Sequence, residues 1–246
     1  MNRPPRRNRV ASPDTAPLHA WDVSPAEARR IQANLAARVD LTDAITLDAI
    51  ETVAGVDNTY VTQDGKTTAG AVVVVLSYPA MEIVETAIAW QPIAFPYVPG
   101  LLSFREAPAV LAACANLTVE PDVFLFDGQG YAHPRRLGLA SHLGLFLERP
   151  TIGCAKSRLV GEYAEPERVF GAHTPLVDRG EVVGAAVRTR PRHKPLFVSP
   201  GHKISVETAV VIALACCRDG AFLPEPTRLA HEIVTRERRS WIESHG

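Results

Sequence analysis

The chain has 246 residues, of which 46% are hydrophobic and 22% are charged, and its formal net charge at pH 7 is −1. This length and composition exclude a wholly disordered chain and predict one large domain or two small ones. No apolar run reaches the roughly 20 residues of a membrane helix, and the N-terminus lacks an apolar signal region, so we expect a cytoplasmic protein with no membrane partner. The four cysteines form no C-x-x-C pair, which argues against a structural zinc site.

The N-terminal region divides into a tail and the start of a folded domain. Residues 1–20 are rich in Pro and Arg and have no apolar period, which predicts a disordered basic arm. The stretch SPAE at 24–27 is a capping box with proline at the first helical position, so a helix is expected from there to about Val39. No linker long enough to divide the remaining chain follows, and we expect residues 21–246 to form a single domain.

Three strand-like runs come next, and short links join them. The link QDGK at 63–66 is typical of a hairpin, and the link around Pro79 is also short. Parallel strands need a long crossover, so these links predict an antiparallel meander. The three strands are expected over residues 52–62, 68–78 and 82–90.

After this meander, helices and strands alternate. An apolar run covers 123–127, a helical pattern covers 138–147, and a second apolar run covers 151–155. This order predicts a strand–helix–strand unit with parallel strands. The expected fold class is therefore α/β, with a mixed sheet (a three-stranded antiparallel meander plus parallel strands) flanked by helices. The other expected elements are helices over 103–117, 205–217 and 226–241 and strands over 181–188 and 196–199.

Two acidic residues stand where the predicted strands are otherwise apolar. Asp57 lies within the first strand, in VAGVDNTY, and Asp127 ends the fourth. Ligands of open α/β sheets bind beyond the carboxyl ends of parallel strands, so two adjacent parallel strands would bring both carboxylates to one point. Carboxylates that meet there repel unless a cation is bound, and oxygen ligands suit Mg²⁺ or Mn²⁺. The alternative is that Asp57 occupies an exposed bulge and Asp127 forms a turn before Gly128.

A third acid, Glu106, belongs to the stretch SFRE at 103–106. One interpretation is an ordinary capping box formed by Ser103 and Glu106. Pro108 argues against it, because proline fits only the first turn of a helix, and the helix is then expected to begin nearer Arg105. Glu106 would lie at the start of that helix and be free to point elsewhere.

Basic side chains lie close to these acids in the predicted fold. His133 and Arg135 fall between Asp127 and the next helix, Lys156 follows the fifth strand, and His202 precedes a helix. At strand ends and helix starts on the side of the acids, these residues are suited to binding phosphate. For each histidine a purely structural role is the alternative.

Five stretches of the chain form long, ordered motifs. They are VAGVD at 53–57, PYVPGLLSFRE at 96–106, DGQGYAHPRRLGLASHLG at 127–144, TIGCAKSRL at 151–159 and LPEPTRLAH at 223–231. These motifs resemble those of the Endonuclease V (deoxyinosine 3′ endonuclease) family, and the likeness runs from about residue 24 to residue 240. The resemblance implies a ribonuclease H-like fold. It also implies a Mg²⁺-dependent DNA repair enzyme that hydrolyses the second phosphodiester bond 3′ to an inosine, leaving 3′-hydroxyl and 5′-phosphate ends.

The resemblance further implies roles for individual residues. Asp57, Glu106 and Asp127 correspond to the metal-binding acids, and His202 to a histidine that assists at the same centre. Lys156, Arg105 and His133 match residues near the scissile phosphate. Pro96, Tyr97, Val98 and Pro99 match a wedge that opens the strand beside the lesion, and the pocket for the everted base would involve Gly100, Leu102, Gly128, Leu139, Gly153 and Leu159. Gln129 departs from the family pattern, because many members have His at this position.

The roles implied for the wedge, the pocket glycines and the basic residues agree with simple physical chemistry. Eversion of a base costs a few kcal/mol, and Tyr97, on a turn stiffened by proline, can fill the vacated stack. Gly128 and Gly153 lack side chains, so a flat purine can approach the backbone closely. Lys156 and His133 would offset negative charge on the phosphoryl oxygens, while His202 or a water on the metal would activate the nucleophile.

Three other interpretations use part of the same pattern. An inosine-specific ribonuclease would use the same site, and the sequence shows no discriminator against a 2′-hydroxyl. A non-catalytic nucleic-acid-binding module would lack at least one of the three acids. A hydrolase of small phosphate esters would have no stack for the wedge to fill. We expect inosine-containing DNA, single- or double-stranded, as the partner, with inosine-containing RNA as the alternative, and a monomeric protein.

Overall fold

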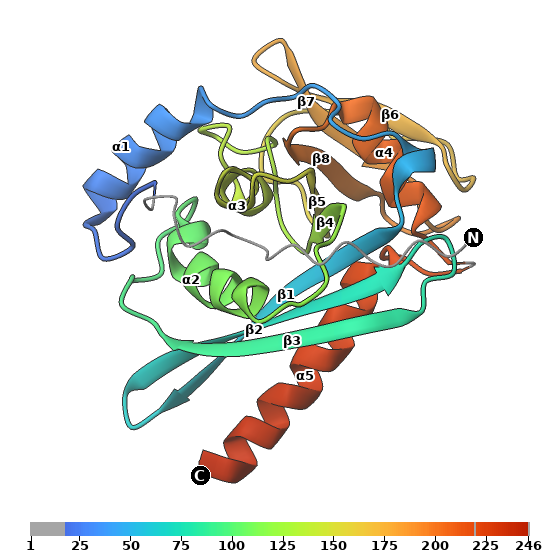
Figure 1. The fold of residues 1–246 in the computed structure, drawn as a ribbon. Helices are drawn as coiled ribbons and strands as arrows, with labels where there is room; N and C mark the ends of the chain where they lie inside the picture. The colour runs from blue at the N-terminus through green and yellow to red at the C-terminus, as the bar shows by residue number, and fades with distance from the viewer. Residues whose placement is uncertain (1–17, 219, 246) are drawn as a thin grey trace.

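The computed structural model describes residues 18–218 and 220–245, so the predicted disordered arm lies outside the described residues apart from positions 18–20. A single eight-stranded sheet runs through the molecule in the order β3-β2-β1-β4-β5-β8-β7-β6 (Figure 1). Among the described residues, no helix has both the length and the apolar character needed to cross a membrane.

The predicted meander is present at one side of the sheet. Its strands are β1 (Thr52–Gln63), β2 (Lys66–Ser77) and β3 (Ile83–Pro92), and each pairs antiparallel with the next. The β1–β2 hairpin turns at Asp64 and Gly65, which both have positive φ. That geometry is typical of the two-residue hairpin loop that the sequence predicts.

The predicted parallel unit is also present and lies beside the meander. β4 (Val123–Phe126) pairs parallel with β1, β5 (Thr151–Ala155) pairs parallel with β4, and α3 (Leu139–Leu147) connects β4 to β5. The register pairs Val56 with Phe126. The next residue on each strand is an aspartate, so this register brings Asp57 and Asp127 to the same end of the sheet.

The far side of the sheet differs from the prediction. β8 (Leu196–His202) is longer than expected and runs antiparallel to β5, and β7 (Glu181–Val187) pairs antiparallel with β8. An unpredicted strand, β6 (His173–Asp178), forms the edge. β6 is short, mostly exposed and contains Pro175, which is tolerated at a sheet edge but weakens a sequence-based strand signal.

Helices cover both faces of the sheet. α2 (Leu102–Ala115) and α3 pack on one face, and α4 (Val206–Ala215) and α5 (Glu225–His245) pack on the other (Figure 1). α1 (Pro25–Ala36) and a single 3₁₀ turn, η1 (Leu47–Ala49), complete the described elements. The expectation that Pro108 delays the start of this helix to near Arg105 is wrong, since α2 begins at Leu102 and contains Pro108 in its interior. Its largely buried apolar side outweighs the hydrogen bond that the proline removes.

Candidate active site

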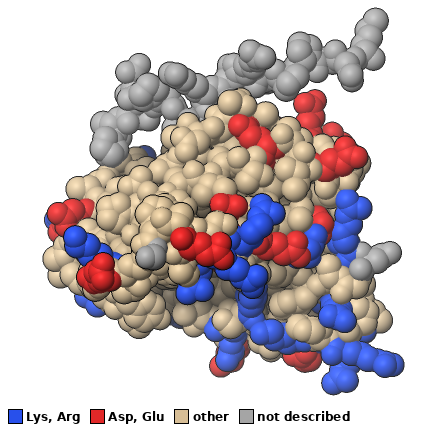
Figure 2. Space-filling model, turned by 90° about the horizontal axis from the view of Figure 1, so that it is seen from below, with Lys and Arg blue, Asp and Glu red and all other residues tan. Residues whose placement is uncertain are grey.

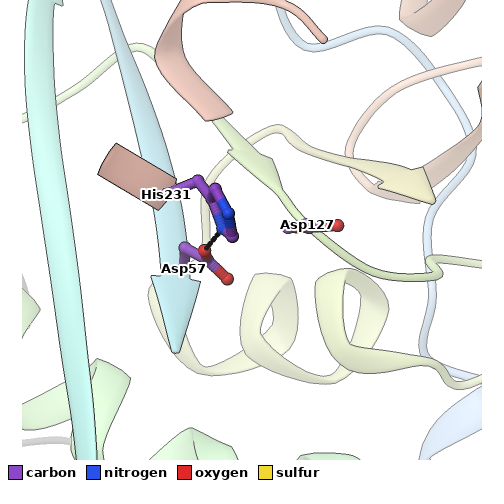
Figure 3. A group of neighbouring side chains, drawn as sticks. All are labelled: Asp57, Asp127 and His231. Carbon is purple, nitrogen blue, oxygen red and sulfur yellow. Dashed lines mark hydrogen bonds and ion pairs between the residues drawn. The ribbon is translucent and has the colours of Figure 1, made fainter. Parts of the chain in front are cut away.

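The two aspartates meet a histidine where the parallel pairing of β1 with β4 ends, Asp57 in the middle of β1 and Asp127 just after β4. One ligand atom from each of Asp57, Asp127 and His231 lies within 4.8 Å of the others. His231 Nδ1 lies 2.8 Å from Asp57 Oδ2, and Asp127 faces this pair from β4 (Figure 3). The predicted convergence of Asp57 and Asp127 is therefore present. Asp57 lies in the regular β1–β2 ladder and not at a bulge, whereas Asp127 and Gly128 do form a bend after β4.

His231 was not predicted as a site residue, although it is the last residue of the motif LPEPTRLAH at 223–231. It reaches the acids because the first turn of α5 packs directly on β1. A Cβ atom at Gly55 would collide with the backbone carbonyl of Pro226, so glycine is required for this close approach. The histidine that the structure brings to the acids is thus His231, positioned by the contact of Gly55 with Pro226.

The expectation that His202 lies at the acids is wrong. β8 runs antiparallel to β5, and its last residue, His202, pairs with Thr151 at the start of β5. Asp127 and Lys156 lie at the other ends of β4 and β5. His202 is buried, and its Nδ1 accepts a hydrogen bond from the Asp40 backbone N–H at 3.1 Å. Its role in this position is to join β8 to the segment that follows α1.

Glu106 lies close to the two aspartates but is held by another partner. Its carboxyl is only 7% exposed and accepts a 2.5 Å hydrogen bond from the Tyr60 hydroxyl. Burial, reinforced by the charges of Asp57 and Asp127, raises the pKa of Glu106 to about 7. The same two causes, burial and the Asp127 charge, raise the pKa of Asp57. Glu106 lies on the second turn of α2 and not at the start of the helix as expected. Its charge interacts with those of Asp57 and Asp127.

These residues fit a divalent cation. We call Asp57, Glu106, Asp127 and His231 the acid centre. Burial, and secondarily the neighbouring carboxylate charges, raise the pKa of Asp57 and of Glu106, and a bound cation would favour their ionised forms. Carboxylate oxygens with one imidazole are donors that Mg²⁺ or Mn²⁺ accepts. Lys156 partly fills the same role here, because its ammonium forms an ion pair with Asp127 Oδ2.

A pocket of about 500 Å³ adjoins the acid centre. Asp127, a member of the acid centre, and Lys156, its ion-pair partner, belong to the wall of this pocket. Five of the six residues predicted to bind the everted base line it, namely Gly100, Leu102, Gly128, Leu139 and Leu159, as does Tyr97 of the predicted wedge. Val98 and Pro99 also contribute to the wall, whereas Pro96 does not. Tyr97 is 71% exposed, which leaves its ring available for stacking.

Two predicted substrate contacts, Gly153 and Arg105, have other partners in the structure. The missing side chain of Gly153 makes room for the backbone of Gly128 and Gly130, so the expectation that a base approaches Gly153 is wrong. Arg105 stacks over the Tyr60 ring at 5.0 Å and donates to the Phe95 carbonyl. Sequence patterns gave no signal for these contacts, because each joins separate parts of the fold.

His133 and Arg135 lie beside the pocket but are turned toward the backbone. Both approach the Gly100 carbonyl, at 3.1 Å for His133 Nε2 and 2.7 Å for Arg135 Nη2. Burial, with a smaller effect of Arg135, lowers the pKa of His133 to about 4. Burial therefore favours the neutral imidazole in the absence of a bound phosphate, and the role of His133 at the phosphate stays a prediction.

Gln129 bridges two segments of the pocket wall. Its Nε2 donates a 2.8 Å hydrogen bond to the carbonyl of Ser157, which follows Lys156. Both residues line the pocket. The residue that departs from the family pattern thus links the loop after β4 to the loop after β5.

The mixed sheet, the acids at two neighbouring parallel strand ends and the adjoining pocket define an α/β protein with a carboxylate centre of the kind that nucleases use. A sequence model of Endonuclease V matches residues 33–232. The endonuclease V of Gloeobacter violaceus is 49% identical over 232 residues, which is 93% of each chain. The chain therefore belongs to the Endonuclease V family, a family of nucleases.

Solved structures give the same result. The crystal structure of endonuclease V from Bacillus subtilis is 37% identical, with a TM-score of 0.89, over 93% of this chain and 98% of that one. Endonuclease V from Ciona intestinalis, in complex with a 24mer DNA containing an inosine followed by a ribo-adenosine, is 30% identical, with a TM-score of 0.74, over 87% of this chain and 98% of that one. The predicted family and the predicted fold class are confirmed.

Proposed function

We propose that the protein is a Mg²⁺-dependent DNA repair endonuclease that recognises inosine and hydrolyses the second phosphodiester bond 3′ to it, leaving 3′-hydroxyl and 5′-phosphate ends. The observation that carries the proposal is the shared wall formed by Asp127 and Lys156. A base held in the pocket would keep the neighbouring backbone beside the acid centre. The related Ciona intestinalis protein was crystallised with inosine-containing DNA, which supports the choice of ligand.

The metal would be held by Asp57, Asp127 and His231, with Glu106 completing the acidic set. When bound, it would supply a Lewis acid and activate water for attack on phosphorus. Mn²⁺ is expected to replace Mg²⁺ because the same donors suit both ions. Lys156, whose side chain is 37% exposed, would turn from Asp127 toward a phosphoryl oxygen and offset its charge.

The residues around the pocket would bind and orient the lesion. Tyr97 would occupy the stack left by the everted base, and aromatic stacking of this kind contributes about 1–3 kcal/mol. Gln129 would keep the two loops of the wall at a fixed spacing through its bond to Ser157. An exposed ring at the mouth of a pocket has no use with a small phosphate ester, so we favour a polymeric substrate.

Surface charge would assist DNA binding at individual positions rather than across a whole face of the molecule. On the side where α5 lies, Lys and Arg gather in the middle and lower right, and acids are interspersed in the middle (Figure 2). Together with the net charge of −1, this pattern favours binding through individual phosphate contacts. The expected cytoplasmic location and monomeric state stay predictions.

An inosine-specific ribonuclease is the second candidate. One observation favours it, namely that the DNA bound to the Ciona intestinalis relative has a ribonucleotide after the inosine. The deciding experiment is nicking of end-labelled inosine-containing duplex DNA, single-stranded DNA and RNA, each with Mg²⁺ and with EDTA. We expect a Mg²⁺-dependent nick two bonds 3′ to the inosine in DNA. Cleavage of RNA alone would favour the second candidate, and cleavage of none would refute both.

A further inference from the structure

Three side chains converge on one backbone carbonyl beside the pocket. We call residues 96–100 the wedge segment, and it ends at Gly100, which has a φ of +75°. The Gly100 carbonyl oxygen has Gln32 Nε2 at 3.0 Å, Arg135 Nη2 at 2.7 Å and His133 Nε2 at 3.1 Å. A carbonyl has two lone pairs, so this oxygen is fully occupied. The end of the wedge segment is thereby fixed relative to α1 and to the loop after β4.

Gln32 connects this carbonyl to α1. Its side chain is only 1% exposed, and its Nε2 also donates to the Leu137 carbonyl at 3.1 Å. Its Oε1 accepts a 2.6 Å hydrogen bond from Arg135 Nε. Every polar atom of the amide therefore has a partner, which is the condition for a buried polar side chain to fix its neighbours. α1 thus supports the wedge segment through one residue.

Arg135 differs from the arginines near it in its charge balance. Arg136 pairs with Asp178 and Glu181, and Arg30 pairs with Glu27. In residues 18–218 and 220–245, no acid forms an ion pair with Arg135, and its Nη1 has no hydrogen-bond partner. Arg29 lies three residues before Gln32 on α1, so the two side chains share one face of the helix, and Arg135 Nε bonds Gln32 Oε1 on that face. Burial and the charge of Arg29 lower the pKa of Arg135. Arg29 is exposed on α1, and within the described part of the chain its guanidinium donates only to the Pro25 carbonyl.

We propose that Arg29 and Arg135 form a phosphate-contact surface for the nucleic-acid backbone, and that Arg135 and Gln32 are positioning residues that join this surface to the wedge segment. Two neighbouring guanidiniums without an acid repel, and a phosphate between them removes the repulsion. Arg135 would keep Nε and Nη2 on the protein and use Nη1 for the phosphate. The proposal rests on the proposed function, because the wedge has a role only if a base is everted.

The test separates the charge from the positioning contact. Binding of labelled duplex DNA, with and without inosine, is measured by fluorescence anisotropy in EDTA at several salt concentrations. Arg29→Gln is expected to reduce the slope of log affinity against log salt by about 0.9, equally on both duplexes. Arg30→Gln is the matched control on the same helix, and its slope is expected to equal that of the unmodified protein. Equal slopes for Arg29→Gln and Arg30→Gln would overturn the phosphate contact.

Two further variants test the link to the wedge segment. Arg135→Lys keeps the charge but loses the planar fork that reaches Gln32 and Gly100, and Gln32→Met keeps the volume but loses the amide. Both are expected to retain the salt slope and to lose preference for inosine by on the order of tenfold. An unchanged preference in Arg135→Lys would overturn the link. If the unmodified protein itself shows no preference for inosine, the proposed function fails, while the slopes on undamaged duplex still test the phosphate contact.

Discussion

The acid centre and the pocket wall lie side by side but are held by different kinds of interaction. Asp57 and Asp127 are placed by the backbone ladder between β1 and β4, in which every residue is fixed by its neighbours. The pocket wall is placed by side chains that reach distant backbone, such as Gln32 to Leu137, 105 residues away in the chain. The fold around these acids is therefore expected to survive a conservative change of an acidic side chain, even where the chemistry does not. The shape of the pocket wall, in contrast, depends on each of the side chains that hold it. Substitutions in the acid centre and in the pocket wall test this difference.

Asp127→Asn is expected to have the largest effect. It removes one charge from the acid centre but keeps the shape of the side chain, so nicking should fall by roughly 10³-fold or more while folding is preserved. Asp178→Asn is the matched control, because the Asp178 side chain is 17% exposed compared with 15% for Asp127 and is also paired with a cation. Nicking rates and melting temperatures are measured for both. A melting temperature of Asp127→Asn that collapses with activity would indicate a structural role instead.

The pH dependence of stability reports on Glu106. Its pKa is raised from the usual 4.5 to about 7, so its protonated form stabilises the metal-free fold fully below pH 4.5, and this stabilisation is lost as the pH rises through 7. The free energy of unfolding in EDTA, measured with urea, should fall by about 3 kcal/mol more in the unmodified protein than in Glu106→Gln between pH 4.5 and 8. Mg²⁺ at pH 8 should restore part of the loss. If the free energy of unfolding changed equally with pH in the unmodified protein and in Glu106→Gln, the raised pKa of Glu106 would be contradicted.

Comparison of His231→Asn with His202→Asn tests the corrected position of the site histidine. His231 is 54% exposed, so its replacement should lower nicking by about 10²-fold with little change in melting temperature. His202 is buried at the other end of the sheet, and asparagine can still accept the bond from Asp40. His202→Asn should therefore nick normally and melt earlier. Normal nicking by His231→Asn together with a loss of nicking in His202→Asn would show that His202, and not His231, acts with the acids.

The same contrast explains which parts of the molecule the sequence could predict. Strand periodicity and short links predicted the meander and the parallel unit, and these alone bring Asp57 to Asp127. His231 could not be placed in this way, because it lies 174 residues from Asp57 and reaches it only through the packing of α5 on Gly55. Gln32 carried no signal at all, since a single glutamine in an amphipathic helix gives no hint of its partners. The position of His202 failed because the direction of β8 cannot be derived from its own residues.

The start of α2 shows how packing can overrule a local rule. Proline in a helix interior costs roughly 3 kcal/mol, which is why Pro108 predicted a later start. Phe104, Ala107 and Val110 are buried on the same helix, and their burial contributes more than this cost. Glu106 is consequently carried inward on a regular turn, where Tyr60 can reach it.

Tyr97→Ala is expected to have the smallest effect and to depend most on the substrate. In duplex DNA the ring would replace a lost base stack, whereas a single strand has less stacking to replace, so the variant should lose about 1–2 kcal/mol of binding on inosine duplex and less on an inosine single strand. Phe170→Ala is a suitable control, because Phe170 is also exposed, at 53% compared with 71% for Tyr97, and does not line the pocket. Affinities in EDTA give both values. Equal losses on the two substrates would show that Tyr97 acts as part of the pocket wall and not as a wedge, since a wall contact with the base is the same in either strand state.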